Sequence, residues 1–383
     1  MNIQIDGVNN SNKGAQLMML AALAAIEQYY PEATVRFNSP LSSSVFSVYT
    51  KLSIIGVQPY WYKRWILDSH IGVYINKLSN QLYAAFSNWR KTTNVDLLID
   101  IGGFQFGDQW NHSERDILSK EYYLKHLRQN GAKVVFMPQA FGPFENNNSK
   151  RMLKVINENS DMIIARDDIS YKYLIESGVN DSKLFLYPDF THQVCPVKPA
   201  VEDKYTSNVC VIPNSMMIRQ NIVSEDLYVH FMSDVCKLII AKGKIPFLFN
   251  HEGTGDMQLC RKINEAFNDS LAVFAGLDAL ETKWVISKSY LVISSRFHGV
   301  ANALSTAVPC LATSWNHKYQ KLFESYGLHD NILDCNDIND AKFKIANYLS
   351  DAENRKTREM LSASGEDISR ANKEMWSKVF SLL

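Results

Sequence analysis

The chain has 383 residues, of which 46% are hydrophobic and 21% charged, and its 40 basic and 40 acidic side chains give a net charge of zero at pH 7. This length and composition fit two globular domains, each able to bury a core. A neutral chain lacks the clustered positive charge that drives nucleic-acid binding, so we expect no nucleic-acid partner.

The first residues, MNIQIDG, lack the basic and apolar regions of a secretory signal peptide. The sequence contains no run of about 18 apolar residues, the length needed to span a bilayer. The six cysteines form no CxxC pair and no zinc-type spacing, so we expect reduced, mostly buried thiols and no metal. These features predict a cytoplasmic protein.

Short apolar strands alternate with helices through the first half of the chain, which is typical of a parallel sheet covered on both faces. The expected strands are Asn2–Asp6, Val35–Asn38, Asp96–Ile101, Lys133–Met137 (ending at Pro138), Asp161–Ala165 and Leu184–Leu186. The expected helices are Ala15–Tyr30, Glu121–Gln129, Ser149–Asn159 and Ser170–Ser177.

The stretch from Tyr49 to Trp89 is rich in aromatic and basic side chains. We interpret it as helices with loops that cover one edge of the first domain. Two roles stay open for it. It could pack on the core as an edge or a lid, or it could contact a membrane surface or a lipid-linked substrate from the cytoplasmic side.

A polar, proline-bearing linker at 196–206 precedes a second series of strands and helices. The expected strands are Asn208–Ile212, Ile245–Phe249, Leu271–Phe274, Tyr290–Ser294 and Pro309–Thr313. The expected helices are Ser224–Ala241, Met257–Phe267, Leu280–Ser287, Val300–Thr306 and a largely helical tail from Asp340 to Leu383.

This pattern predicts an α/β protein of two Rossmann-like domains facing across a cleft, with residues 1–195 in the first domain and 196–383, including the C-terminal helices, in the second. Because ligands of open α/β sheets bind at the carboxyl ends of the strands, polar residues just after the strands are the candidate site.

The strongest candidate is the sequence SSRFHG, where Arg296, His298 and Gly299 follow a buried strand and precede a helix. Arginine matches phosphate or carboxylate, and histidine carries a proton near neutral pH. Glycine and a helix N-terminus let an anion approach the backbone. The alternative is a solvated arginine beside a core histidine, but this combination favours an anion site with an acid/base group.

Arg166 occupies the equivalent position in the first half, directly after the strand DMIIA, and Asp167 or Asp168 could cap the next helix. A surface ion pair is an equally good interpretation of Arg166. The loop GVNNSNKG precedes the first helix and resembles a phosphate loop only loosely. Its polar residues could contact a substrate, or it could be a plain turn; the candidates there are Asn9, Lys13 and Gly14.

Other strand ends carry weaker signals, each of which a tight turn or a surface contact would also explain. The candidate substrate-binding residues at these ends are Gly102, Gly103, Gln139, Gly142, Asp189, His251, Asn316 and Lys318.

Taken in order, these motifs resemble the polysaccharide pyruvyl transferase family. The residues that carry the resemblance are GVNNSNKGAQLMMLAAL, DIGGFQFGD, MPQAFGPF, ARDDISYKYL with YPDF, and SSRFHGVANALSTAVPCLATSWNHKYQKLFESYGL. They span residues 7–328. Two pairs of residues depart from the family's pattern. Phe104-Gln105 replaces smaller, Ser-like residues, and Ala140-Phe141 replaces the commoner Ser-Ile, which affects the expected acceptor pocket.

The resemblance implies a glycosyltransferase B-like fold and transfer of pyruvate from phosphoenolpyruvate to two hydroxyls of one sugar, giving a cyclic ketal and phosphate. It implies that Arg166 and Arg296 clamp phosphoenolpyruvate, that His298 transfers the proton, and that no further cofactor is needed. The acceptor would be a sugar of a cell-surface polysaccharide or its precursor, either lipid-linked or not, on the side of the first domain, with the donor on the second.

Two rival functions stay open. A nucleotide-sugar glycosyltransferase would need a polar residue that grips a ribose, and His251 with Glu252 could supply it. A non-catalytic subunit of a polysaccharide-assembly complex would leave Arg166, Arg296 and His298 as structural ion pairs.

Overall fold

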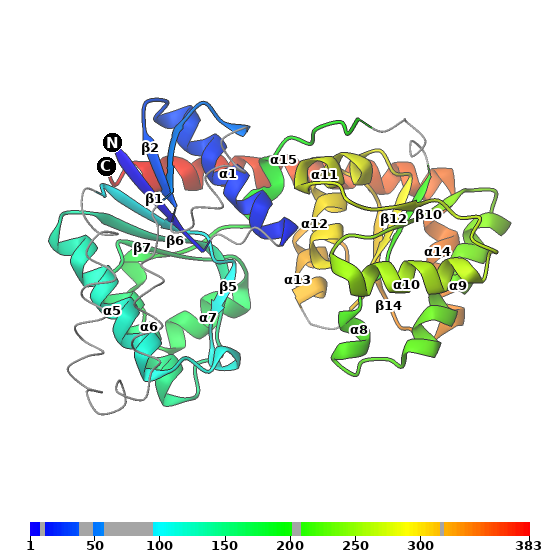
Figure 1. Cartoon of the computed structure of the whole chain (residues 1–383), viewed down its shortest axis with the longest axis horizontal. Coiled ribbons are helices and arrows are strands. Elements are labelled where there is room, and N and C mark those ends of the chain that lie inside the picture. Colours follow the sequence, from blue (N-terminus) through cyan, green and yellow to red (C-terminus); the bar gives the residue numbers. More distant parts are fainter. Residues whose placement is uncertain (8–11, 38–48, 57–94, 201–207, 315–317) are drawn as a thin grey trace. The chain divides into compact units, whose positions relative to one another are not determined.

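The computed structural model describes residues 1–7, 12–37, 49–56, 95–200, 208–314 and 318–383. Packing divides the chain into two units. Unit 1 comprises Met1–Ser11, Ala15–Thr191 and Ala371–Leu383, and unit 2 comprises Asn12–Gly14 and His192–Arg370. Each unit is an α/β layer structure with its own parallel sheet (Figure 1).

The sheet of unit 1 has the strand order β3-β2-β1-β4-β6-β7-β8, with β5 paired to β6, and every pair is parallel. Its strands are β1 (Asn2–Asp6), β2 (Thr34–Phe37), β3 (Ser53–Gly56), β4 (Leu97–Asp100), β5 (Phe104–Phe106), β6 (Lys133–Phe141), β7 (Met162–Ala165) and β8 (Leu184–Leu186). Its helices are α1 (Lys13–Tyr29), α5 (Glu114–Gln129), α6 (Asn147–Glu158) and α7 (Asp168–Glu176).

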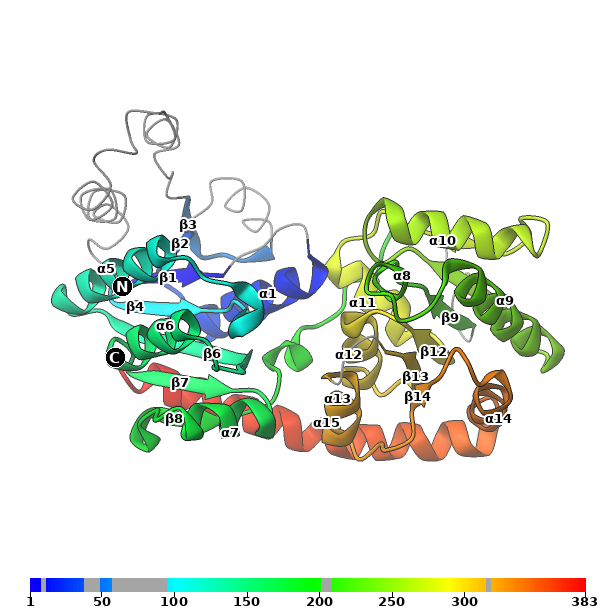
Figure 2. The same cartoon turned by 90° about the horizontal axis from the view of Figure 1, so that it is seen from below.

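Both faces of this sheet are covered, as the continuous apolar strands predict. Residues of α5, α6 and α7 form one core with alternate residues of β4, β6 and β7. Figures 1 and 2 place α1 and the end of α15 on the opposite side of the sheet from α5 and α6. Ser113 forms a capping box at the start of α5, and Asp167 caps α7 by accepting from the Ser170 backbone N–H.

The sheet of unit 2 has the order β11-β10-β9-β12-β13-β14 and is also parallel. Its strands are β9 (Val209–Ile212), β10 (Pro246–Phe249), β11 (Val273–Phe274), β12 (Leu291–Ser294), β13 (Cys310–Thr313) and β14 (Ile332–Leu333). Its helices are α8 (Met216–Arg219), α9 (Glu225–Ala241), α10 (Gly253–Glu265), α11 (Ala279–Ser287), α12 (Phe297–Ser305), α13 (Lys318–Ser325), α14 (Ile338–Tyr348) and most of α15 (Asp351–Phe380).

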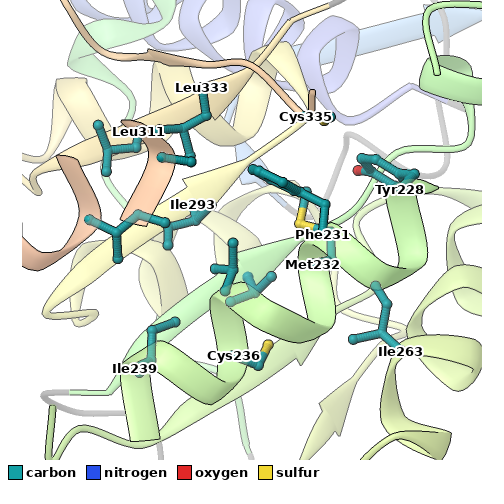
Figure 3. Close-up of a cluster of buried hydrophobic side chains, with 14 of the residues drawn as sticks. Tyr228, Phe231, Met232, Cys236, Ile239, Ile263, Ile293, Leu311, Leu333 and Cys335 are labelled. Atoms are coloured by element: carbon teal, nitrogen blue, oxygen red, sulfur yellow. The ribbon is translucent and has the colours of Figure 1, made fainter. Parts of the chain in front are cut away.

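Alternation along β9 divides the core of unit 2 into two layers. Val209 and Val211 pack with α9, α10 and α14, whereas Cys210 and Ile212 pack with α11, α12 and α13. Figure 3 shows the first of these layers, with the aromatic and sulfur-bearing side chains of α9 lying against the sheet. Full burial of one such side chain contributes roughly 1.5–3 kcal/mol.

In each sheet the winding direction reverses beside the first strand of the unit, between β1 and β4 and between β9 and β12. Such a switch point is where ligands of open α/β sheets bind, because the connections leave on opposite faces there. The carboxyl ends of these strands therefore locate the candidate sites.

Most predicted elements are present, but several bounds differ. β6 continues through Pro138 to Phe141 instead of ending at the proline. A proline is tolerated there because β6 is irregular at this point, with a register shift against β7 between Phe136 and Gln139. α10 and α12 begin earlier than predicted, at Gly253 and Phe297. Helix α13 and strand β14 were not predicted.

The predicted domain boundary at 195/196 also differs in detail from the packing units. The last turns of α15 belong to unit 1, because Trp376 packs edge-on against Phe190 and Phe380 packs on Tyr30. The predicted helical edge segment at 49–89 lies outside the described residues beyond Gly56, and its described part contains the edge strand β3.

Candidate functional site

Arg296 is the N-cap of α12 and lies two residues beyond the end of β12. Ser294 holds this turn, because its hydroxyl accepts from the Arg296 backbone N–H at 3.0 Å and donates to the Arg296 carbonyl at 2.9 Å. The sequence places the arginine after the strand correctly, and the earlier start of the helix puts His298 and Gly299 in its first turn. The first-turn N–H groups of a helix have no intrahelical acceptor and favour anions.

The guanidinium of Arg296 is held by two carboxylates of α10 and its N-cap. Its Nε and Nη2 donate to Asp256 at 2.7 and 2.9 Å, and its Nη1 donates to Glu252 at 2.8 Å. Burial opposes the charged form, but the hydrogen bonds that Arg296 donates to Asp256, with the charges of Asp256 and Glu252, outweigh it and raise the pKa of Arg296. Arg296 is therefore a permanently charged group with a fixed orientation.

A buried hydrogen-bond network fixes the backbone that carries Arg296. The Ser295 carbonyl accepts from Asn214 Nδ2 and from the Tyr319 hydroxyl, both at 2.8 Å. The Ser295 hydroxyl lies 2.6 Å from that of Tyr228, whose pKa burial raises. These partners come from both sides of the switch point in unit 2, so the strand end is held from β9, α9 and α13 together.

Lys13 begins α1 and contributes a second cation to unit 2. Its Nζ donates to Thr282 Oγ1 at 3.0 Å and lies 5.3 Å from the centre of the Phe249 ring. Burial lowers the pKa of Lys13 to about 8, although Glu252 and Asp278 oppose this shift. The side chain therefore titrates within reach of neutral pH.

His251 follows β10 and is 2% exposed. Neither of its ring nitrogens has a hydrogen-bond partner among the described residues. Burial, with the positive charges of Lys13, His298 and Arg296, lowers the pKa of His251 well below its usual value. The imidazole is neutral, and its unused hydrogen-bonding capacity costs roughly 1–3 kcal/mol for each buried group.

His298 lies directly against the first turn of α1. A Cβ atom added at Gly14 would fall 1.9 Å from His298 Nε2, so a side chain at this position would displace the imidazole. Gly299 is restricted in the same way, because a Cβ would fall 2.4 Å from Ser294 Oγ. Lys318 places its Nζ 4.9 Å from the centre of the Phe297 ring in α12.

Arg166 lies in unit 1, where it follows β7 as predicted. Its Nη1 is 4.0 Å from Asp189 Oδ2, at the outer limit of an ion pair, and its side chain is 12% exposed. Its backbone N–H donates to the Gln139 carbonyl at 3.2 Å. The Gln139 side chain is fully buried, and neither its amide oxygen nor its amide nitrogen has a hydrogen-bond partner within the described ranges.

The switch point of unit 1 carries two buried carboxylates in register, Asp6 on β1 and Asp100 on β4. Asp100 accepts from the Gly102 N–H at 3.0 Å, from Gln105, and from Lys120 Nζ at 3.4 Å. Burial and the neighbouring Asp100 raise the pKa of Asp6, although Lys120 opposes the shift.

Glycines shape two turns of unit 1, the first of which adjoins this carboxylate pair. Gly7 has φ +80° and its backbone touches that of Gly102, where a Cβ would fall 2.4 Å from the Gly102 nitrogen. Gly142 has φ +81° and packs on the Tyr173 ring, and its bond to Pro143 is cis.

The structure thus gathers the predicted residues into two groups, one in each unit. Asn9 and Asn316 lie outside the described residues. The predicted residues brought together in unit 2 are Lys13, Gly14, His251, Arg296, His298, Gly299 and Lys318. Those at the strand ends of unit 1 are Gly102, Gly103, Gln139, Gly142, Arg166 and Asp189.

Sequence reasoning missed Asp256, which makes two of the three hydrogen bonds to the Arg296 guanidinium. A signal for it was present: Glu252 and Asp256 are four residues apart after a strand, which puts both on one face of a helix. It also missed the Asp6–Asp100 pair, whose signal is an aspartate ending each of two neighbouring strands.

Other properties of the described residues bear on the site. No group of three or more His, Cys, Asp or Glu side chains among them is arranged to hold a metal ion. All six cysteines are free thiols, and only Cys195 is exposed. No helix in the described part of the chain is long and apolar enough to cross a membrane.

Solved structures of similar fold include UDP-N-acetylglucosamine 2-epimerases and a protein in complex with UDP. A putative UDP-N-acetylglucosamine 2-epimerase from Listeria monocytogenes has a TM-score of 0.64 at 10% identity, over 98% of this chain and 97% of that one. The UDP-GlcNAc 2-epimerase from Neisseria meningitidis, bound to UDP-GlcNAc, has a TM-score of 0.62 at 11% identity over the whole of both chains. Anabaena HepE in complex with UDP has a TM-score of 0.61 at 10% identity, also over both whole chains.

These likenesses confirm the predicted α/β fold of two Rossmann-like domains of the glycosyltransferase B type. No curated protein sequence matches the chain significantly. A model of the family described as polysaccharide pyruvyl transferase matches residues 12–317, which include every residue of the two groups except Lys318. The chain therefore belongs to the polysaccharide pyruvyl transferase family.

Proposed function

We propose that this protein transfers the pyruvyl group of phosphoenolpyruvate to two hydroxyls of one sugar in a cell-surface polysaccharide or its precursor, forming a cyclic ketal and releasing phosphate. The observation that carries the proposal is the gathering of Lys13, Arg296, His251 and His298 in unit 2. The family assignment supports a transferase that modifies polysaccharides.

Phosphoenolpyruvate carries a carboxylate and a phosphate, so its site needs more than one cation. Arg296 donates three of its five N–H groups to Asp256 and Glu252, which leaves two of them to meet an anion in the fork geometry that suits carboxylate or phosphate. Lys13 adds a second positive charge, and its pKa of about 8 would rise towards its usual value when a dianion binds beside it.

The chemistry then needs one proton at the methylene carbon of the donor and one nucleophile at the neighbouring carbon. His298 is the proposed acid: it gives its proton to the methylene carbon, which becomes a methyl group. One sugar hydroxyl adds to the positively charged carbon and loses its proton to His298. The C–O bond to phosphate then breaks, and the second hydroxyl closes the ketal as its proton leaves with the phosphate.

The acceptor is proposed to use unit 1, where the polar side chains of Gln139 and Asp189 lie on β6 and just after β8. Gln139 is a buried amide without partners among the described residues, and Asp189 lies near Arg166. Amide and carboxylate groups are the usual partners of sugar hydroxyls. Arg166 is proposed to be required for the same reaction. The acceptor could be lipid-linked, which would bring the enzyme to the cytoplasmic face of a membrane.

A nucleotide-sugar glycosyltransferase is the second candidate, because UDP or UDP-GlcNAc is bound in solved proteins of similar fold. The residues proposed to grip the ribose in that case were His251 and Glu252. Glu252 already accepts a hydrogen bond from Arg296, which weakens this assignment.

Calorimetric titration of the purified protein with phosphoenolpyruvate, UDP and UDP-sugars distinguishes the two candidates. We expect phosphoenolpyruvate to bind, and Arg296→Ala and Arg166→Ala each to weaken binding by about 1.5–3 kcal/mol, the scale of a charged hydrogen bond. Arg261→Ala, an exposed arginine on α10, is the matched control and should bind like the wild type. Binding of UDP-sugars with no binding of phosphoenolpyruvate would reject pyruvyl transfer.

A further inference from the structure

Asp256 lies in the first turn of α10 and is the carboxylate that holds the Arg296 guanidinium from behind. It is fully buried, whereas the Arg296 side chain is 17% exposed. One of its oxygens, Oδ1, accepts from the Ser215 backbone N–H at 2.9 Å and from Arg296 Nη2 at 2.9 Å. The other, Oδ2, accepts from Arg296 Nε at 2.7 Å.

In this arrangement two hydrogen bonds to Asp256 hold the guanidinium of Arg296, and a third, from the Ser215 N–H, holds the carboxylate of Asp256 itself. An arginine side chain has several rotatable bonds, and holding it loosely would cost conformational entropy when an anion binds. Two parallel N–H···O bonds to a fixed carboxylate remove that freedom beforehand and set the plane of the fork.

We propose that Asp256 is a positioning residue, which sets the direction in which Arg296 presents its remaining N–H groups to the anionic donor. The inference rests on the proposed function, because it assigns Arg296 to donor binding. Asp256 itself, being buried behind the guanidinium, is not proposed to touch the donor.

Glu252 provides an internal contrast. It makes a single hydrogen bond to Arg296, its side chain is 29% exposed, and it is the N-cap of α10 without a side-chain capping bond. It carries the same charge as Asp256 close to the same guanidinium. Removing either charge should have the same electrostatic effect on an anionic donor, but only the loss of Asp256 should release the orientation of Arg296.

The test compares Asp256→Asn with Glu252→Gln in steady-state turnover of phosphoenolpyruvate. The rate is measured as the release of phosphate. In Asp256→Asn the amide oxygen can still accept from Ser215, but the amide nitrogen then faces Arg296 Nε–H and cannot accept from it. We expect KM for phosphoenolpyruvate to rise and kcat/KM to fall by on the order of 10- to 100-fold, the scale of a misplaced binding group. In Glu252→Gln the single acceptor is kept and Arg296 stays held by Asp256, so we expect a smaller change in kcat/KM than in Asp256→Asn.

The split between KM and kcat distinguishes positioning from loss of folded protein. A smaller folded fraction lowers apparent kcat and leaves KM unchanged, whereas a misdirected Arg296 raises KM. A fall in kcat alone would therefore overturn the proposal, and so would equal changes of the same sign in Asp256→Asn and Glu252→Gln.

A double-mutant cycle with Arg296→Lys tests whether Asp256 acts through Arg296. Lysine is a point charge without a planar fork, so its orientation matters little. We expect Asp256→Asn to change kcat/KM much less in the Arg296→Lys background than in the wild type. An equal loss in both backgrounds would overturn the inference. A wild type that binds UDP-sugars but no phosphoenolpyruvate in the calorimetric titration would instead reject the proposed function, together with the inference that depends on it.

Discussion

Arg296 and Arg166 occupy equivalent positions in the two units, each just after a buried parallel strand and before a helix. Their surroundings differ. Arg296 makes three hydrogen bonds of 2.7–2.9 Å to two carboxylates of unit 2. Arg166 has its carboxylate partner Asp189 at 4.0 Å in unit 1.

The comparison teaches that one local motif can produce two kinds of cation. A buried carboxylate with two hydrogen bonds fixes the orientation of Arg296 and neutralises part of its charge. A distant carboxylate leaves Arg166 with a looser electrostatic partner. We expect the first arginine to matter for both stability and donor orientation, and the second mainly for binding.

The largest expected effect is on stability. Arg296→Ala leaves Asp256 as an uncompensated buried charge and should lower the free energy of unfolding by roughly 3–5 kcal/mol. Arg166→Ala removes a 4.0 Å ion pair, and the loss of that pair by itself should cost less than about 1 kcal/mol. Urea unfolding of both variants at pH 7 measures the difference. Equal losses would mean that the two arginines are not distinguished by their carboxylates.

The explanation of the Arg296→Ala result can be tested by comparing the stability of this variant with that of the double variant Arg296→Ala/Asp256→Asn. The second substitution removes the buried charge that the first leaves behind, so it should recover part of the lost stability. A double variant less stable than Arg296→Ala alone would contradict this explanation.

A second prediction concerns the pH dependence of unit 2. Because the pKa of Lys13 is about 8 in the folded protein and 10.5 is its usual value, the folded state releases the proton first as the pH rises. The charge on Lys13 thus lowers the free energy of unfolding. This loss of stability is fully present below pH 8 and disappears by about pH 10.5. The variant Lys13→Met removes it at every pH.

We expect the stability difference between Lys13→Met and the wild type to shift in favour of the wild type across this pH window, by less than about 3 kcal/mol. Urea unfolding at pH 7 and at pH 10 measures it. Lys51→Met, an exposed lysine of unit 1, is the control and should show no such shift. A pH-independent difference for Lys13→Met would contradict the lowered pKa.

The smallest expected effect concerns Asp6 in unit 1, whose stability contribution changes with pH in the opposite direction to that of Lys13. The pKa of Asp6 is raised by burial, so the folded state holds the proton to higher pH than the unfolded state. The resulting stability is present below pH 3.8 and is lost as the pH rises through the folded value. Asp6→Asn stays neutral and can still accept from Gln4 Nε2. It should gain stability relative to the wild type as the pH rises from 3.5 to 7; a constant difference would contradict the prediction.

Much of the fold could be predicted because its signals are local. Continuous apolar strands such as Leu97–Asp100 and Met162–Ala165 are recognisable from their own residues. Helix bounds were less predictable: α12 begins at Phe297, three residues before the predicted start. Helix-breaking and polar residues near a strand end mask the first turn, and the tertiary contacts of Ser294 and Arg296 decide where it begins.

Signals for strands, turns and helices reside in neighbouring residues, so they sufficed to indicate two α/β units and to place Arg166 and Arg296 after buried strands. The groups that surround these arginines depend instead on the tertiary fold. Asp256 is 40 residues from Arg296, and Lys13 is 269 residues from Thr282. The packing of the whole unit brings such residues together, and no local pattern in the sequence specifies it.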